Sequence, residues 1–308
     1  MKKQIAIRVI ELILLLIVLS LLTFALMYIA PGDPAEKRLS SQGVAVTREV
    51  LQAERERMGL LRPFFVRYGE WFVGILHGDF GISFKDDLPV APKLWNGLQN
   101  TIVLAMGSLL LSLLVSVPVG IFSAVKRNSM FDHIARILSF VGNSLPNFLI
   151  SVLLMYFFCI QLDAFPIIAT GSLQGLILPT LSLAIPMASR FTRQIRTEVA
   201  TQMDEDYVVG LRLKGVKEHY ILLRNVFHNS IGHIFTIVAL QIGTLMGGSV
   251  VIETIFRWPG IGKLVMDSIT ARDYPVIMGF VLIMGTIYVG INLISDIVNR
   301  IIDPRVEW

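Results

Sequence analysis

The chain has 308 residues, of which 54% are hydrophobic and 16% charged, and its mean hydropathy is +0.67. A soluble domain carries about 25% charged residues, so the composition excludes an ordinary soluble protein and favours an all-α integral membrane protein. The single cysteine, Cys159, excludes an intrachain disulfide and a cysteine-based metal site. The net charge of +4 is distributed in a way that fits membrane topology better than nucleic-acid binding.

Six uncharged stretches are long enough to cross a bilayer as helices. With a rise of about 1.5 Å per residue, roughly 20 residues cross a hydrocarbon core about 30 Å thick. Membrane strands need about half as many residues and alternate in polarity, so these runs predict six transmembrane helices. The fourth stretch is the shortest and contains Pro179 and Pro186. The predicted spans are 12–32, 101–125, 137–162, 171–189, 229–252 (with His233) and 274–295.

The first run follows Lys2, Lys3 and Arg8, as the apolar region of a signal peptide would. It is longer than such a region, and no A-x-A site precedes the sequence PGDP. We therefore interpret residues 1–32 as a cytoplasmic N-terminus followed by a retained transmembrane helix.

Residues 33–99 are predicted to form an external helical segment. Thr47 is a candidate N-cap and Gly59 a candidate helix stop, and Pro63 opens a second helix with aromatic residues at helical spacing. Two interpretations stay open here. The segment is an amphipathic hairpin on the membrane surface, or it is a docking surface for an outside partner.

The distribution of Lys and Arg predicts the orientation of the chain. The 126–136 turn carries three of these residues, whereas the 163–170 turn on the opposite side carries none. Short loops dominate the positive-inside rule, so both termini and the block 190–228 are expected in the cytoplasm. A core of five helices then covers 100–302, followed by a cytoplasmic tail, 303–308.

No enzymatic motif stands out. WPGIGKL lacks the spacing of a phosphate loop and has Leu264 where a magnesium-binding Ser or Thr would stand. The ionisable residues Glu11, Asp163, Glu253 and Asp296 fall near the ends of predicted spans, which argues against ion coupling in mid-membrane. We expect no catalytic residue, cofactor or metal on this chain, and any energy must come from a partner.

The stretch DEDYVVGLRLKGVKEHYILLRN is densely charged between two apolar segments. Asp204, Glu205 and Asp206 are expected in a first helical turn, where acids favour the helix dipole. Tyr207, Val208 and Leu211 share one face, Gly215 ends the helix, and a second helix starts at Glu218. A solvated loop and a DNA-binding helix-turn-helix are alternatives. Apolar spacing argues against the first and the flanking spans against the second, so the pattern favours a rigid element that docks into a cytoplasmic partner.

This block resembles the EAA loop of permease subunits of binding-protein-dependent ABC importers. The run EDYV…G.R.KG is similar to the dipeptide/oligopeptide/nickel permease branch. Val209, Gly210 and Leu211 stand at the E-A-A positions, Gly215 is retained, and His228 replaces the closing Pro. Further matches, in the family's order, are PGDP, HGDFGIS, PVGIFSAVKR, ETIFRWPGIG, RDYPVI and the terminal DPR.

The resemblance implies a type I ABC importer permease fold. It implies a second, similar permease, two cytoplasmic ATPases that hold the ATP and Mg, and an external solute-binding protein. The coupling loop would be 196–229. Its implied contact residues are Asp206, Gly210, Lys214, Gly215 and Arg224.

Polar residues inside the spans are candidates for lining a translocation pathway, although hydrogen bonding between helices is an equally common role for such groups. The candidates are Asn143, Ser144, Asn147, Gln241, Thr244 and Asn292.

The cargo implied by the resemblance is nickel, free or chelated, or short peptides. The short turn 161–171 and the sequences SFVGNSLPNF and LHGDFGISF resemble nickel-type members. The alternative is an ATP-independent channel or facilitator made of several copies of a six-span unit. A channel, however, has no need of a rigid cytoplasmic docking element.

Overall fold

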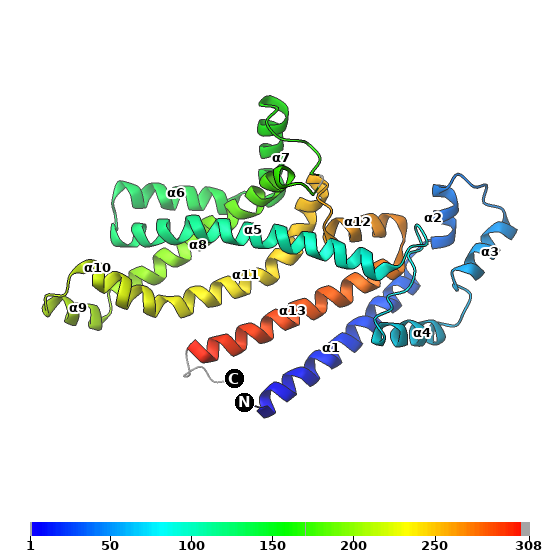
Figure 1. Ribbon diagram of the computed structural model, residues 1–308, viewed down its shortest axis with the longest axis horizontal. Helices are drawn as coiled ribbons and strands as arrows, with labels where there is room; N and C mark the ends of the chain where they lie inside the picture. The colour runs from blue at the N-terminus through cyan, green and yellow to red at the C-terminus, as the bar shows by residue number, and fades with distance from the viewer. Residues whose placement is uncertain (1, 170, 303–308) are drawn as a thin grey trace. The chain divides into compact units, whose positions relative to one another are not determined.

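The computed structural model describes residues 2–169 and 171–302, with the side chains of residues 10–169, 171–243 and 245–294. The predicted tail, 303–308, lies outside the described residues. The described chain is helical (Figure 1), apart from one isolated bridge between Ile82 and Pro89. The helices are α1 (Lys2–Ile29), α2 (Pro34–Ser41), α3 (Arg48–Arg57), α4 (Phe64–Leu76), α5 (Val90–Val125), α6 (Met130–Ser144), α7 (Asn147–Met155), the π-helical turn η1 (Tyr156–Gln161), α8 (Leu173–Met203), α9 (Asp206–Leu213), α10 (Glu218–Tyr220), the π-helical turn η2 (Ile221–Val226), α11 (Phe227–Phe256), α12 (Ile261–Ala271) and α13 (Tyr274–Ile302).

Four helical segments of the described chain are long and apolar enough to cross a membrane. They are Ile10–Ile29, Val90–Val125, Glu218–Gly243 and Tyr274–Ile294, and the bent pair α6 and α7 adds a fifth if it is one span. These correspond to five of the six predicted spans. The predicted fourth span, 171–189, lies in α8 from Leu173 onward, in a helix of 31 residues that contains Pro179 and Pro186.

The third predicted span is not one continuous helix, and that expectation was wrong. α6 ends at Ser144, α7 begins at Asn147, and their axes differ by 98°. Leu145 between them is extended, with ψ 130°. Pro146 explains the break, because proline disfavours helical conformation in the residue before it and has no N–H to donate.

The described chain forms two compact units, which are treated separately below. The first comprises residues 1–101 and 259–290. Its core joins Phe24 of α1 to Val265 of α12 and to Tyr274, Ile277 and Met278 of α13.

The helices predicted in 33–99 form at their predicted signals. Thr47 caps α3 by accepting from the Val50 amide at 3.4 Å, Gly59 is left-handed with φ +66°, and Pro63 is the N-cap residue of α4. The ring centroids of Phe64 and Tyr68 lie 5.2 and 5.5 Å from that of Phe24. The aromatic face of α4 therefore packs on α1.

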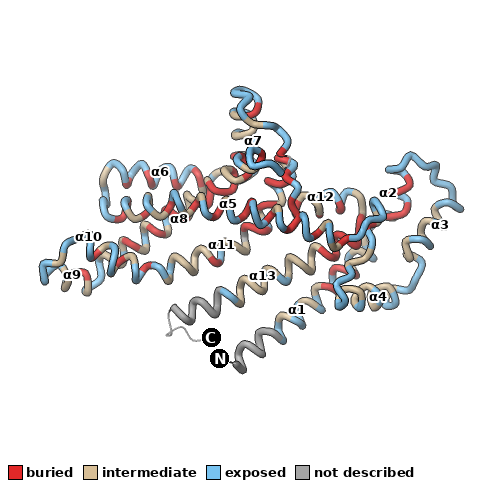
Figure 2. The backbone as a smooth tube through the Cα atoms, viewed as in Figure 1, coloured by how far each residue is buried: buried red, intermediate tan, exposed pale blue. Residues whose placement is uncertain are grey.

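The second unit comprises residues 102–258 and 291–308. α8 runs through its core, and buried residues recur along this helix from Leu178 to Val199 (Figure 2). α8 starts at a Ser172 cap, whose hydroxyl accepts from the Gly175 amide at 3.1 Å. Because α8 packs against α6, α7 and α11, it positions polar residues from all of them.

Candidate functional site

Polar side chains from three helices of the second unit meet at Arg190. Nε of Arg190, on α8, donates to Oδ1 of Asn143 on α6 at 3.3 Å. Nη1 of the same guanidinium donates to Oε1 of Gln241 on α11 at 3.2 Å. All three residues are half-buried. The structure thus joins two predicted pathway residues through an arginine.

A glycine permits the close approach of α6 and α8 at this level. A Cβ at Gly142 would lie 2.2 Å from Oγ of Ser189 and 3.2 Å from its Cβ. Both distances are shorter than ordinary side-chain contacts. Gly142 therefore lets α6 lie against α8 and places the next residue, Asn143, beside the residue after Ser189, which is Arg190.

A small cavity of about 50 Å³ lies at the same cluster. Arg190 and Gln241 line it together with Asn147, the first residue of α7 after the Pro146 break. Its other lining residues are Leu183, Pro186, Met187, Leu245 and Gly248. The cavity therefore combines one charge and two amides with an apolar wall.

The other predicted pathway residues are not part of this cluster. Ser144 is exposed, and its hydroxyl donates to the Phe140 carbonyl of its own helix at 2.8 Å. Asn292 is half-buried on α13 and does not line the cavity. The side chain of Thr244 lies outside the described residues.

Sequence reasoning missed Arg190 because the fourth uncharged stretch ends at the residue before it. α8 continues past that point to Met203, so an arginine expected at a span end lies within a core helix. A helix that keeps its apolar periodicity beyond the last uncharged residue was the signal that could have found it.

A second candidate site is the turn between α9 and α10. Gly215 has φ +74°, the left-handed conformation predicted for a helix stop. The Val216 amide donates to the Leu211 carbonyl at 3.2 Å. Nε of Arg212 donates to Oε1 of Glu218 across the turn at 2.7 Å. These contacts hold the two helices in one short, closed element.

The face that Tyr207, Val208 and Leu211 were predicted to share packs on the core. Val208 is fully buried, and Tyr207 and Leu211 are half-buried against the same apolar cluster. Of the three acids expected in the first turn only Asp206 lies in it, and Glu205 is the N-cap residue of α9. Asp204 caps the end of α8 and accepts from Nη1 of Arg127 at 2.8 Å, so α9 begins at Asp206.

The outer face of the turn exposes large apolar side chains beside charged ones. Leu213 is 84% exposed, Leu223 65% and Tyr220 56%. Of the predicted contact residues, Gly210 is half-buried, and the others are exposed: Asp206, Lys214, Gly215 and Arg224. Exposed apolar side chains gathered on a rigid element are typical of a protein-binding surface.

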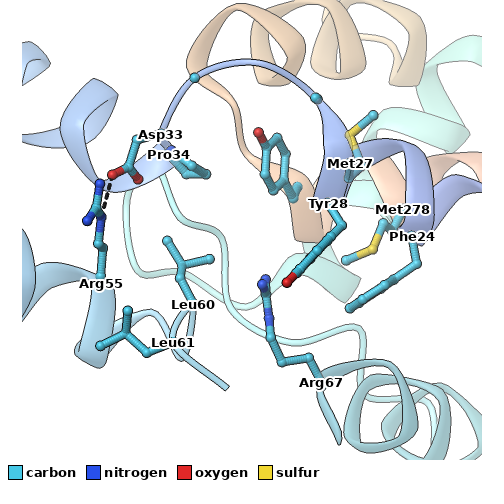
Figure 3. Close-up of a pocket in the computed structure, with 13 residues that line it drawn as sticks. Phe24, Met27, Tyr28, Asp33, Pro34, Arg55, Leu60, Leu61, Arg67 and Met278 are labelled. Carbon is cyan, nitrogen blue, oxygen red and sulfur yellow. Dashed lines mark hydrogen bonds and ion pairs between the residues drawn. The ribbon is translucent and has the colours of Figure 1, made fainter. Parts of the chain in front are cut away.

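The first unit holds a pocket of about 320 Å³ at the C-terminal end of α1 (Figure 3). Asp33 accepts from Nε of Arg55 at 2.6 Å on one wall. Arg67 reaches from α4 toward Tyr28 on the other wall, and its guanidinium carbon lies 5.7 Å from the centre of the Phe24 ring. Burial lowers the pKa of Arg67. The predicted outer segment therefore presents a concave surface that mixes basic and apolar groups.

Apolar helices of membrane-spanning length are typical of a multi-pass membrane protein, and the exposed apolar side chains of the α9–α10 turn are typical of a surface that contacts a partner. The family model for the binding-protein-dependent transport system inner membrane component matches residues 116–308. The model for the N-terminal part of such membrane components matches residues 1–105. The chain belongs to this family.

Curated relatives are similar in sequence to this protein over nearly the whole chain. The nickel import system permease protein NikB of Staphylococcus aureus strain bovine RF122 / ET3-1 is 35% identical over 303 residues, covering 98% of this chain and 91% of the relative. The protein of the same name from strain MRSA252 is also 35% identical, with the same coverage.

Solved structures show the same fold. Two inward-facing crystal forms of the MetNI methionine ABC transporter align with TM-scores of 0.55 and 0.57, at 14% and 17% identity. Each alignment covers 68% of this chain and at least 95% of the other chain. The protein is therefore the membrane permease subunit of an ABC importer, with a type I permease fold in the inner membrane. ATP hydrolysis in such importers is carried out by separate ATPase subunits, and a solute-binding protein delivers the cargo.

Proposed function

We propose that this permease subunit moves nickel, free or chelated, or short peptides into the cell after delivery by the external solute-binding protein. The similarity to nickel import permeases over nearly the full chain supports nickel as the first cargo to test. The peptide alternative rests on the peptide-permease motifs in the sequence.

The α9–α10 turn is the observation that carries the coupling mechanism. Leu213 and Leu223 would enter an apolar groove on the ATPase, while Asp206, Lys214 and Arg224 make polar contacts at its edge. Gly210 and Gly215 shape the element. Because the turn is closed by its own hydrogen bonds, it would move as a rigid body when the ATPases close, and the spans would switch between outward- and inward-facing arrangements.

The assembly contains a second, similar permease and two ATPase subunits, which bind ATP and Mg in place of any cofactor on this chain. Both termini and the coupling loop, 196–229, face the cytoplasm, as the positive-inside rule indicates. The segment 33–99 faces outward, and its concave basic and apolar surface supports a contact with the binding protein.

Asn143, Asn147 and Gln241 line part of the translocation pathway in this proposal. Asn147 and Gln241 line one cavity, and Asn143 accepts a hydrogen bond from Arg190, which lines the same cavity; these contacts support that role. Ser144, Thr244 and Asn292 are pathway candidates on their sequence positions alone.

The test is to tag the chain in its native host, extract it in mild detergent and identify stoichiometric partners. We expect a second six-span permease and a P-loop ATPase. The same preparation in proteoliposomes, supplied with the binding protein, should take up nickel or a dipeptide only with ATP. Recovery of a homo-oligomer with passive flux would establish the channel instead.

A further inference from the structure

A second cavity of the second unit, about 260 Å³ in volume, lies between α6 and α8 and shares no lining residue with the cavity beside Arg190. Three arginines line it: Arg136 from α6, and Arg193 and Arg196 from α8. Among the described residues, its lining contains no acid. This pocket, called the α6–α8 pocket below, therefore concentrates positive charge.

A single carboxylate neutralises part of this charge. Asp132, which is completely buried, accepts from Arg196 at 2.5 and 2.7 Å and lies 3.7 Å from Nε of Arg136. The guanidinium of Arg193 is exposed and makes no ion pair or hydrogen bond with any group that the structure describes. Three arginines and one aspartate leave a net charge of +2, so the pocket attracts an anion.

Two buried hydroxyl groups are available to the same anion. Ser139 on α6 and Thr192 on α8 both line the pocket, and each is 6% exposed. Neither hydroxyl has a hydrogen-bond partner among the described residues. A buried hydroxyl without a partner is unusual, because folding removes its hydrogen bond to water. An oxygen atom of a ligand in the pocket would restore that hydrogen bond.

The pocket lies where two predicted spans end on the same side. Arg136 directly precedes the uncharged stretch 137–162, and Arg193 follows the end of the stretch 171–189 by four residues. The positive-inside rule assigns this end to the cytoplasm. Phe140, which lines the pocket, is 68% exposed, so the pocket opens onto the apolar surface of α6.

These features favour an anionic phospholipid over a free anion. The oxygens of its phosphodiester accept from guanidinium and hydroxyl donors, and arginine binds phosphate in bidentate geometry. Its acyl chains would cover the apolar surface of α6, where Ile137 and Leu138 are 62% and 64% exposed. Basic pockets between membrane helices on the cytoplasmic side bind the head groups of anionic lipids.

We propose that the α6–α8 pocket binds the head group of an anionic phospholipid from the cytoplasmic leaflet. Arg136 and Arg193 bind the phosphate, and Ser139 and Thr192 donate hydrogen bonds to its oxygens. Arg196, which Asp132 holds in place, adds positive potential. The inference goes beyond the proposed transport function and takes from it only the orientation of the chain.

The test counts the lipids bound to the complete importer in neutral detergent by native mass spectrometry. Dioleoyl phosphatidylglycerol should bind in a saturable way, at least about tenfold more tightly than phosphatidylcholine with the same acyl chains. At limiting lipid, Arg193→Gln should remove one phosphatidylglycerol per copy of this chain. The affinity of that site should fall at least about fivefold, because the variant lacks one basic contact.

Three further variants separate the pocket from general attraction to a basic surface. Lys126→Gln removes a positive charge at an exposed position outside the pocket, on the same predicted side, and should leave the count unchanged. Arg193→Lys keeps the charge and should retain most of the binding. Ser139→Ala removes a hydroxyl that binds no described protein group and should weaken binding about threefold. This variant still tests the site if Arg193→Gln does not assemble.

Each contrary outcome would overturn the lipid site. Equal binding of the two lipids would do so, and so would equal losses in Arg193→Gln and Lys126→Gln, which indicate general electrostatic attraction. Displacement of the lipid by an equimolar amount of inorganic phosphate at constant ionic strength would identify a free anion as the ligand. An importer that retains no phosphatidylglycerol would show that another subunit covers the pocket. Because none of these measurements depends on uptake, their failure would leave the proposed transport function intact.

Discussion

Arg196 on α8 binds Asp132 on α6 through both carboxylate oxygens, at 2.5 Å from Nε and 2.7 Å from Nη2. Asp132 is completely buried, and it also accepts from the Ser123 hydroxyl at 2.5 Å and the Asn128 amide at 3.0 Å. One carboxylate thus holds the start of α6, the end of α5 and the C-terminal part of α8 together.

Replacing this carboxylate should destabilise the protein strongly. Asp132→Ala leaves the Arg196 charge without its partner, and removing one partner of a buried pair costs about 3–5 kcal/mol. The free energy of unfolding in mixed detergent micelles measures the effect. Asp204→Ala removes an exposed partner of Arg127 and should cost less than about 1 kcal/mol. Equal losses for the two variants would contradict this assignment.

The conformation of Gly215 should be essential for coupling. Gly215→Val places a β-branched residue at φ +74°, which costs on the order of 1–3 kcal/mol and reshapes the turn. We expect the purified complex to hydrolyse ATP while its uptake falls. Gly290→Ala, on α13 and outside the coupling loop, is the control, because no atom lies within 4 Å of the added Cβ and its φ is not left-handed. Normal uptake in Gly215→Val would show that the turn tolerates other shapes.

Leu213, the exposed leucine of the turn, should contribute to binding of the ATPase and not to folding of the permease. Leu213→Ser should reduce the ATPase that co-purifies, since it removes an apolar side chain from the proposed groove. Stability of the isolated permease should change by no more than about 0.5 kcal/mol, as for most surface substitutions. Leu173, which is 85% exposed at the start of α8, provides the control Leu173→Ser. If both substitutions lower ATPase recovery equally, the loss is not specific to the turn.

Asp87 should make the predicted outer segment sensitive to acid. A hydrogen bond from Arg38 lowers the pKa of Asp87 to about 2, against the opposing effect of burial, and Arg57 adds a second hydrogen bond. An unfolded aspartate titrates near about 3.9. Because the folded pKa is depressed, this stabilisation is complete above about pH 4 and is lost as the pH falls toward 2.

The expected loss is modest, since Asp87 is 48% exposed and solvent screens the pair. Limited proteolysis of the whole chain between pH 5 and pH 2 measures this loss of stability, because that pH range covers both the unfolded and the folded pKa of Asp87. Asp87→Asn should remove part of the acid sensitivity, and Glu70→Gln, in an exposed pair with Arg62, should not. An unchanged pH profile for Asp87→Asn would show that other carboxylates control this segment.

Substitutions at Gly142 and Ser189 should have coupled effects on the free energy of unfolding. Gly142→Ala crowds Ser189, because the new Cβ would lie 2.2 Å from its Oγ and 3.2 Å from its Cβ, so the Ser189 side chain or α6 must shift. Overpacking of this kind costs about 1–3 kcal/mol. Ser189→Gly in the same chain should recover much of the loss, and a double-mutant cycle on the free energy of unfolding measures the interaction. Additive effects would mean that α6 shifts without strain.

The sequence alone determined the helical membrane architecture and several local signals. Apolar runs specify helices because a bilayer leaves backbone groups no other partners. The Thr47 cap, the Gly59 and Gly215 stops and the helix start at Glu218 are confirmed because each depends on neighbouring residues. The family was also evident, since its motifs follow in order along the chain.

Only the tertiary structure decided which polar groups meet. Arg190 is far in the sequence from Asn143 and Gln241, and their contact depends on how closely α6, α8 and α11 pack. The same holds for Asp132 and Arg196. Pro146 signalled a local interruption, but the direction in which α7 leaves depends on the helices against which it packs. Caps and spans follow from local backbone chemistry, whereas the polar cluster depends on side-chain shape between distant helices.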